Sequence, residues 1–286
     1  MKRVLVFYGY FDLWHDIYDK NPLMKYLYDI IDDVVLFKNM NELRNYLKTE
    51  GQNYKNYILP SRIHHMHELN DANINSLFKI DSSYLKQLED KKLFVDYVSK
   101  NNLKKFCPRI YTKSCNRNED KLVIVKPRDS AFSIGVYKKK LCELKDCEFD
   151  ENVVQEYIYD SKEYAGYFVS HNGKITLAFA YVGEYGNNAY IKCAGGKFDP
   201  TPQKRVMLND KIISVFEKFL KPCSYTGTCC FDFKIKDRKI YVFEINPRMG
   251  GSLNAPKNEK DLTNIIRDLM KIYDIRNVYN LSLIHI

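Results

Sequence analysis

The sequence predicts a protein of mixed α/β and α+β architecture, in which a small parallel α/β domain precedes a larger region that carries a β-hairpin. Strand-like and helix-like patterns alternate over residues 1–85, which favours a parallel sheet covered by helices. Further along, two apolar runs flank the polar stretch Lys236–Lys239, as in a hairpin. With 286 residues, the chain is long enough to form two or three subdomains.

Three short apolar runs predict the strands of the N-terminal sheet. They are Lys2–Phe7, Val34–Phe37 and Tyr57–Leu59, and a helical pattern around Leu43–Leu47 follows the second. Ligands of parallel sheets lie beyond the carboxyl ends of the strands. We therefore expect Gly9, Tyr10 and Pro60–Arg62 to face a cleft shared with the rest of the molecule.

Three histidines, His64, His65 and His67, follow the third of these strands. A metal site, a substrate contact and a solvated loop are all compatible with this cluster. Two adjacent histidines in a strand-to-helix loop usually point apart, and a metal needs a fourth ligand from elsewhere. The pattern therefore favours a solvated loop first, a substrate contact second and a metal site last.

The next two segments combine a helix with a lysine-bearing strand. The stretch that begins at Asp90 has the apolar spacing of a helix, and we expect it to end before Pro108, since proline disfavours helical backbone at the preceding residue. The β-branched run Lys121–Val125 ends in Lys126 and is followed by the small-residue loop Arg128–Val136. A lysine that faces the free N–H groups of such a loop is suited to bind phosphate oxygens.

Three further patterns complete the predicted elements. The apolar run Val153–Ile158 predicts a strand. Leu208–Leu220 has the spacing of an amphipathic helix, which we expect to cover the sheet that carries the hairpin. Lys260–Tyr273 predicts a second such helix.

The hairpin brings three oxygen-bearing side chains together. If its turn is centred on Arg238, Asp232 pairs directly across from Glu244, which follows it by twelve residues. Glu244 and Asn246 then share one face, because side chains alternate along a strand. Such oxygens suit Mg²⁺, which is usually held by one or two carboxylates and by substrate phosphates. Arg248 follows two residues later, where it can meet an anion bound to that metal.

The hairpin, its Asn-Pro-Arg-x-Gly-Gly-Ser ending and the order of the upstream segments resemble the ATP-grasp superfamily. Biotin carboxylase, carbamoyl-phosphate synthase and D-alanine–D-alanine ligase are members of it. The ending is most similar to the carbamoyl-phosphate-synthase-like and amino-acid-ligase branches. The resemblance covers roughly residues 85–256 and implies an ATP-grasp fold, in which two subdomains grip ATP.

The resemblance implies a binding site for ATP with Mg²⁺ or Mn²⁺. It assigns the phosphates to Lys126 and to Lys91, with Lys92 as an alternative, under a loop that contains Ser133 and Gly135 but less glycine than the family pattern. It assigns the base and ribose of ATP to Glu156, Tyr157, Ile158 and Glu163. It assigns the metal to Asp232, Glu244 and Asn246, and catalysis to Arg248 and Lys126.

The reaction implied by the resemblance is ATP-dependent ligation of two small molecules. A carboxylate is activated as an acyl phosphate and then joined to an amine, with release of ADP and phosphate. The N-terminal domain and the segment Gly183–Lys197, with Tyr185, Asn187 and Lys192, would shape the acceptor site. A kinase, a carboxy- or carbamoyl-phosphate-forming enzyme and a non-catalytic ATP-binding module remain alternatives. The complete set of two carboxylates, an asparagine and an arginine favours an enzyme.

Composition restricts the partners that we expect. The chain is 45% hydrophobic and 28% charged, as in water-soluble globular proteins. The net charge of +9 is spread along the chain, so we expect a lysine-rich surface with a polyphosphate pocket in preference to nucleic-acid binding. No apolar stretch approaches 18 residues, and the eight cysteines lack a zinc-site spacing. We expect free, mostly buried thiols and a cytoplasmic protein without a membrane segment that could form a homodimer.

The predicted domain boundaries follow from these assignments. The N-terminal domain covers residues 1–85, the first nucleotide-binding subdomain 86–155, and the second, with the metal hairpin, 156–280. Residues 281–286, Leu-Ser-Leu-Ile-His-Ile, match the translation of a sequencing-library adapter, CTGTCTCTTATACACATC. We expect an artefactual tail there; the alternative is a genuine apolar terminal strand.

Overall fold

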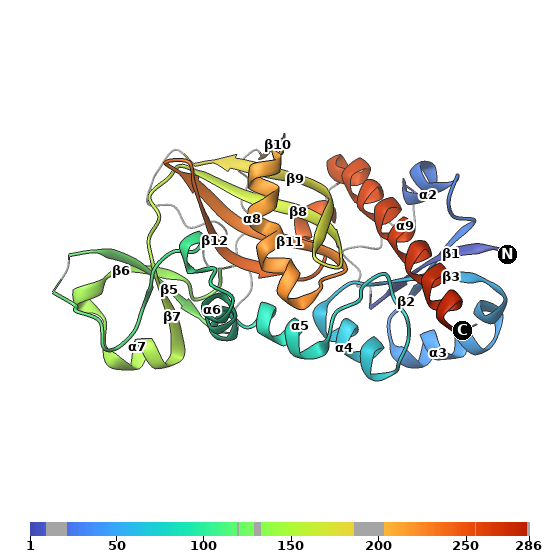
Figure 1. Cartoon of the computed structure of the whole chain (residues 1–286), viewed down its shortest axis with the longest axis horizontal. Helices are drawn as coiled ribbons and strands as arrows, with labels where there is room; N and C mark the ends of the chain where they lie inside the picture. Colours follow the sequence, from blue (N-terminus) through green and yellow to red (C-terminus); the bar gives the residue numbers. More distant parts are fainter. Residues whose placement is uncertain (10–21, 119, 129–132, 186–202, 255, 285–286) are drawn as a thin grey trace.

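Three β-sheets follow one another along the longest axis of the molecule in the computed structural model (Figure 1). The structure describes residues 1–9, 22–118, 120–128, 133–185, 203–254 and 256–284. In these residues a three-stranded sheet forms the N-terminal domain, and sheets of four and five strands form the remainder. The structure confirms the predicted fold class, a mixed α/β protein with a parallel N-terminal sheet.

The N-terminal sheet is parallel, as predicted, with the strand order β2-β1-β3. Its strands are β1 (Arg3–Tyr8), β2 (Asp33–Phe37) and β3 (Lys55–Pro60). The predicted helix around Leu43–Leu47 is α3 (Met40–Lys48), whose N-cap residue Asn39 accepts a hydrogen bond from the amide of Glu42. Three helices were not predicted: α2 (Pro22–Leu27), α4 (Ile63–Asp71) and α5 (Ser82–Glu89).

The second sheet is antiparallel, with the order β4-β7-β5-β6. Its strands are β4 (Ile110–Tyr111), β5 (Leu122–Pro127), β6 (Tyr137–Lys140) and β7 (Asn152–Glu156), accompanied by the helices α6 (Lys91–Lys100) and α7 (Asp146–Glu151). The predicted strand that ends in a lysine is β5. Two predicted ends were wrong. The helix that begins after Asp90 ends at Lys100, because Asn102 adopts a left-handed conformation (φ 58°). The strand expected to reach Ile158 ends at Glu156.

The third sheet is also antiparallel, with the order β10-β9-β8-β11-β12. Its strands are β8 (Lys162–His171), β9 (Lys174–Glu184), β10 (Gln203–Met207), β11 (Gly227–Lys236) and β12 (Lys239–Asn246). One face is apolar and packs against α8 (Asp210–Leu220), where Phe216 contacts Phe231 and Phe233 with ring centres 4.8 and 4.9 Å apart. This confirms the predicted helix that covers the hairpin sheet, and it leaves the opposite face of the sheet for other contacts.

A long C-terminal helix, α9 (Glu259–Ile284), joins the third sheet to the N-terminal domain (Figure 1). Near its start, Asp261 accepts a hydrogen bond from Tyr181 of β9. Further along, Asp274 pairs with Lys55 at 2.9 Å and accepts a hydrogen bond from Tyr57 of β3. The predicted helix Lys260–Tyr273 is therefore the first part of a longer one, whose later turns contact the N-terminal domain.

Short 3₁₀ helices occupy several connections. They are η1 (Glu50–Asn53), η2 (Lys104–Phe106), η3 (Leu141–Glu143), η5 (Lys221–Cys223), η6 (Gly251–Asn254) and η7 (Pro256–Asn258). The boundary proposed at residues 85/86 falls inside α5, whose buried residues Leu85 and Leu88 belong to one helix face. The boundary proposed at 155/156 falls at the end of β7.

Four of the seven cysteines in the described ranges are buried, and all seven are free thiols. Among these residues, no helix has both the length and the apolar character needed to cross a bilayer.

Candidate active site

The hairpin of β11 and β12 turns at Asp237 and Arg238, both of which have positive φ, as type I′ turns require. Next to this turn the pairing is regular, up to Phe233 with Val242. The register then shifts by one residue, so that Asp232 pairs with Glu244 and Phe243 becomes the extra residue of a β-bulge. The predicted pair is therefore present, although the turn is centred half a residue before Arg238.

Strand pairing places the site residues in rows on the face of the sheet opposite α8, since directly paired residues project to the same side. The first row runs across all five strands and contains Glu244, Asp232, Ala165, Tyr181 and Arg205. A neighbouring row contains Asn246, Cys230, Tyr167, Phe179 and Met207. The two predicted carboxylates and the predicted asparagine thus come from one face at one edge of the sheet.

The three candidate metal ligands lie within hydrogen-bonding distance of one another. Nδ2 of Asn246 lies 3.3 Å from Oε1 of Glu244 and 3.5 Å from Oδ2 of Asp232. Two carboxylates and an amide oxygen fit Mg²⁺, which takes oxygen ligands and leaves positions for phosphate and water. Within the described ranges, no cluster of three or more His, Cys, Asp or Glu side chains offers a metal site.

Two lysines from the second sheet and its first helix face these carboxylates. Burial lowers the pKa of the Lys126 ammonium; the carboxylates of Glu244 and Glu163 act in the opposite direction, whereas Lys91 reinforces the lowering. Burial acts to raise the pKa of Glu244, but the ammonium groups of Lys126 and Lys91, together with its contacts to Asp232 and Asn246, hold that pKa below its ordinary value. Lys126 of the second sheet and Lys91 of α6 therefore interact with Glu244 of the third sheet, and the carboxylate of Glu244 is kept ionised.

The start of α6 distinguishes between the two adjacent lysines. Asp90 caps the helix by accepting hydrogen bonds from the amides of Lys92 and Leu93, and its other oxygen pairs with Arg128 at 2.5 Å. Nζ of Lys92 donates to the carbonyl of Asp150 at 2.9 Å, whereas Lys91 interacts with Lys126 and Glu244. Of the two, Lys91 is the one beside the carboxylates.

The loop after β5 is described in part. Ser133 and Gly135 both have positive φ, and a Cβ on Gly135 would approach Cγ of Pro127 to 2.8 Å. Glycine at position 135 therefore lets the returning chain pass close to the end of β5. Ser130 and Ala131, which were expected to contribute to this loop, lie outside the described residues.

The segment after β7 carries the residues expected to contact the base. The amide of Glu156 donates to the carbonyl of Arg109, and the amide of Tyr157 donates to that of Leu122. Ile158 is buried, whereas the side chain of Glu156 is turned outward to the amide of Arg109 at 3.4 Å. The Ile158 side chain is therefore directed towards the interior and the Glu156 carboxylate away from it, while the amides of Glu156 and Tyr157 are bonded to Arg109 and Leu122.

Two lysines beside Tyr157 were missed by the sequence reasoning. Nζ of Lys234 donates to the carbonyls of Ile158 and Asp160, at 3.3 and 2.9 Å. Burial lowers its pKa, whereas the carboxylates of Glu163 and Asp160 act in the opposite direction. Nζ of Lys138 is buried without a hydrogen-bond partner, 5.0 Å from the Tyr157 ring centre. The alternation of β11 was the available signal for Lys234, which follows Asp232 by two residues on the same face.

Arg248 lies just beyond the end of β12. Its Nη1 donates to the carbonyl of Met249 at 2.8 Å, and its Nη2 lies 3.4 Å from Oδ1 of Asn246. The loop continues through Gly250, where a Cβ would approach the Tyr167 ring to 2.6 Å, and Ser252 hydrogen-bonds to the hydroxyl of Tyr167. The close approach requires glycine, and it fixes the loop next to Asn246.

The N-terminal domain presents Gly9 and Ser61 at the carboxyl ends of β1 and β3. The Ser61 hydroxyl donates to the carbonyl of Gly9 and lies 3.1 Å from Nδ1 of His65. His65 is buried in α4, and a Cβ on Gly9 would overlap its ring. The solvated loop favoured for the three histidines is therefore wrong: they lie in a helix, and the rings of His64 and His65 are 3.9 Å apart. Tyr10, and Asn187 and Lys192 of the expected acceptor segment, lie outside the described residues.

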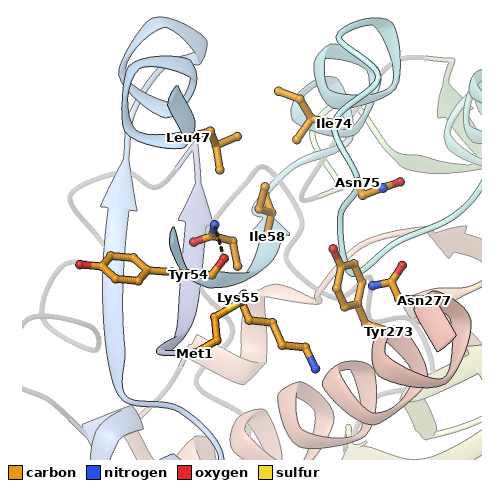
Figure 2. Close-up of a pocket in the computed structure, with 10 residues that line it drawn as sticks. Met1, Leu47, Tyr54, Lys55, Ile58, Ile74, Asn75, Tyr273 and Asn277 are labelled. Carbon is orange, nitrogen blue, oxygen red and sulfur yellow. Dashed lines mark hydrogen bonds between the residues drawn. The ribbon is translucent and has the colours of Figure 1, made fainter. Parts of the chain in front are cut away.

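A cavity of about 380 Å³ lies at the other end of the parallel strands (Figure 2). Met1 and Lys55, at the amino-terminal ends of β1 and β3, line it together with Tyr273 and Asn277 of α9. Because ligands of parallel sheets lie at the carboxyl ends, this cavity is separate from the candidate active site.

Comparisons with known proteins agree with this geometry. A family model described as an ATP-grasp domain matches residues 88–252. The comparison with curated proteins gave no match. Among solved structures, the fold is similar to that of D-alanine–D-alanine ligase from Bacillus anthracis complexed with ATP (TM-score 0.58, 16% identity, covering 96% of this chain and 99% of that one). It is also similar to L-amino acid ligase from Bacillus licheniformis (TM-score 0.60, 12% identity, covering 93% of this chain and 74% of that one). A third similar structure is biotin carboxylase from Campylobacter jejuni (TM-score 0.56, 10% identity, covering 94% of this chain and 70% of that one). Since the family model spans more than half of the sequence, the chain belongs to the ATP-grasp family.

Proposed function

We propose that this protein is an ATP- and Mg²⁺-dependent ligase that activates a carboxylate as an acyl phosphate and joins it to an amine. The observation that carries the proposal is the convergence of Asp232, Glu244 and Asn246 on one sheet face, opposite Lys126 and Lys91. Carboxylates and ammonium groups that face each other across a cleft are suited to hold a metal–polyphosphate complex, because they bind its cation and its anion together.

The nucleotide would lie between the second and third sheets. Lys126 and Lys91 would bind the α- and β-phosphates, with Ser133 and Gly135 above them. The backbone of Glu156, Tyr157 and Ile158 would meet the edge of the base, and Glu163 would accept hydrogen bonds from the ribose. The solved complex of the D-alanine–D-alanine ligase with ATP supports a nucleotide in this fold.

The residues of this chain act mainly by positioning and by charge. The donor carboxylate attacks the γ-phosphorus, the bond to the β,γ-bridging oxygen breaks, and ADP leaves. Bound Mg²⁺, held by Asp232, Glu244 and Asn246, would neutralise the negative charge that otherwise repels the attacking carboxylate. No protein nucleophile is needed, since orientation and electrostatic stabilisation account for most of the rate in such transfers.

The second half of the reaction takes place at the end of β12. The amine attacks the acyl carbon, a tetrahedral oxyanion forms, and the C–O bond to phosphate breaks as the nitrogen loses a proton. Arg248 would stabilise the acyl phosphate and the oxyanion, with help from the N–H groups of Gly250 and Gly251. The D-alanine–D-alanine ligase and the L-amino acid ligase of similar fold support an amide-forming reaction of this class.

The test is a screen of pooled carboxylic acids and amines with ATP and Mg²⁺, read by the nucleotide product. A ligase of this type releases ADP and phosphate, and hydroxylamine traps its activated acid as a hydroxamate. Formation of AMP and pyrophosphate would contradict an acyl phosphate. A stable phosphorylated product without a need for amine would indicate a kinase, and binding of ATP without turnover on any acid would indicate a binding module.

A further inference from the structure

A second cavity, of about 170 Å³, opens on the same face of the third sheet as the metal-site candidates. Its lining residues are polar or charged: Tyr181, Gln203, Arg205, Lys257, Asn258 and Asp261. They come from β9, β10, η7 and the first turn of α9, all of which are described. The mechanism proposed above does not use any of them.

Strand register fixes the position of this cavity relative to the metal site. Tyr181 and Arg205 belong to the same row as Asp232, two and three strands away. With strands about 4.8 Å apart, the cavity begins about 10 Å from Asp232. The residue between them in the row is Ala165, which is itself buried.

The guanidinium of Arg205 is held in place at the edge of the cavity. Its Nε lies 2.9 Å from both carboxylate oxygens of Asp261, and the Tyr181 hydroxyl donates to the same carboxylate at 2.7 Å. The guanidinium also stacks over Phe179, 4.7 Å from the ring centre. The Asp261 side chain is 12% exposed and that of Arg205 43% exposed, so the acid is covered while the arginine faces the cavity.

The balance of charge determines which ligand fits. Arg205 and Asp261 neutralise each other, and Lys257 adds one further positive charge. Asn258, which donates to the carbonyl of Ser252 at 2.7 Å, contributes a fixed amide. Nε of Arg205 is engaged by Asp261, and Nη1 contacts the sulfur of Met207 at 3.1 Å, which leaves the remaining N–H groups of Nη1 and Nη2 for a ligand. A positively charged polar cavity with such an oriented arginine is suited to a carboxylate.

We propose that this cavity binds the carboxylate of the amine substrate, so that the acceptor is an amino acid or another amine with a carboxylate at its far end. The proposal rests on the proposed ligase function. The reacting carboxyl group of the donor must lie on the γ-phosphate at Asp232 and Glu244, too far away to occupy the cavity. The acceptor must reach the acyl carbon beside Arg248 and Ser252, and η7 and α9, which follow that loop directly, line the cavity.

The test compares amide formation with hydroxamate formation in Arg205→Gln. Hydroxylamine needs no carboxylate contact, so the ratio of amide to hydroxamate isolates the acceptor subsite. Paired amines that differ only in bearing a carboxylate or a carboxamide serve as acceptors. Loss of a charge-assisted contact should raise the KM for the carboxylate-bearing amine about 10- to 100-fold and remove the preference over the carboxamide. Arg205→Lys, which keeps the charge but not the fork, should restore part of that preference.

Lys204→Gln is the matched control, because Lys204 is the exposed neighbour of Arg205 on the other face of β10 and should keep the wild-type ratio. An unchanged amide-to-hydroxamate ratio in Arg205→Gln, or a preference for the carboxamide in the wild-type protein, would overturn the proposal. Equal loss of amide and hydroxamate would also overturn it, by assigning the cavity to the donor acid. Absence of hydroxamate from the wild-type protein with every acid would contradict the ligase itself.

Discussion

The ammonium of Lys126 lies 5.1 Å from the centre of the Phe243 ring. Phe243 is the extra residue of the bulge in β12, so the lysine of one sheet contacts the irregularity of the other. Without the bulge, the turn at Asp237 and Arg238 would pair Glu244 with Phe231 and direct its carboxylate into the core. The bulge therefore has two effects: it aligns Glu244 with Asp232, and it provides an apolar surface beneath the Lys126 side chain.

Replacing Lys126 with alanine should weaken ATP binding and leave adenosine binding unchanged. The lost contact is with phosphate, and a hydrogen bond to a charged group contributes about 1.5–3 kcal/mol, or roughly a 10- to 100-fold change in Kd. Isothermal titration calorimetry with both ligands measures the difference. Lys92→Ala is the control, because Lys92 donates to Asp150 and should bind ATP normally. If Lys126→Ala weakened the binding of ATP and of adenosine equally, Lys126 would have a structural role and would not contact phosphate.

Asp232→Asn and Glu244→Gln should each lower kcat by at least about 100-fold without unfolding the protein. Removing one carboxylate weakens the binding of Mg²⁺, whose charge stabilises the transition state by several kcal/mol. The loss should be larger for Glu244, which also interacts with Lys126 and Lys91. Turnover is measured over a range of Mg²⁺ concentrations. Circular dichroism checks that each variant is folded, which separates loss of metal binding from loss of structure. Near-normal turnover at saturating substrate in either variant would exclude the hairpin as the metal site.

Replacing Arg248 with alanine should lower kcat far more than it weakens ATP binding. The guanidinium lies beyond Asn246, at the end of β12, and its charge is needed mainly where new negative charge develops. Loss of one such stabilising group typically lowers the rate by about 10²–10³-fold. Steady-state kinetics with ATP titrations measure the two quantities, and unchanged turnover would contradict the role of Arg248 in the reaction.

Local patterns in the sequence were sufficient to predict the hairpin and its carboxylates. Apolar alternation and a polar turn lie within the segment that forms the structure, so Asp232, Glu244 and Asn246 could be placed on one face. The bulge was not predicted. Ile240 and Val242 are buried in the register set by the turn, but Ile245 is three residues after Val242 and can be buried on the same face only if the strand contains one extra residue.

Other parts of the site depend on contacts between distant segments. Arg205, Tyr181 and Asp261 meet only after β9, β10 and α9 have packed together, and no spacing in the sequence signals this. His65 was misjudged for a similar reason: its burial depends on Gly9, which lies on another strand. The ends of elements were also missed where a single residue such as Asn102 adopts positive φ.

Arg238→Gly should increase the free energy of unfolding by about 1 kcal/mol. Arg238 has a φ of 61°, a conformation that costs a residue with a Cβ about 1–2 kcal/mol and that glycine adopts freely. Urea unfolding measures the change, and activity should be retained because the turn lies away from the carboxylates. Lys239→Gly is the control: it is the first residue of β12, where glycine should destabilise by about 0.5–1 kcal/mol. Destabilisation by Arg238→Gly would mean that the arginine side chain makes a necessary contact.

His65 should make the protein less stable as the pH falls from about 6.5 to 4. Burial in α4, reinforced by the neighbouring His64 and Arg62 and opposed by Glu68, lowers the pKa of His65 to about 4. Below pH 6.5 the unfolded chain therefore takes up a proton that the folded protein does not, which favours unfolding. A shift of this size corresponds to a loss of about 2 kcal/mol at pH 5 relative to pH 7.5. Urea unfolding at the two pH values should show this loss in the wild type and in His67→Gln, but a smaller one in His65→Gln. The same pH dependence in all three proteins would mean that His65 is protonated in the folded state.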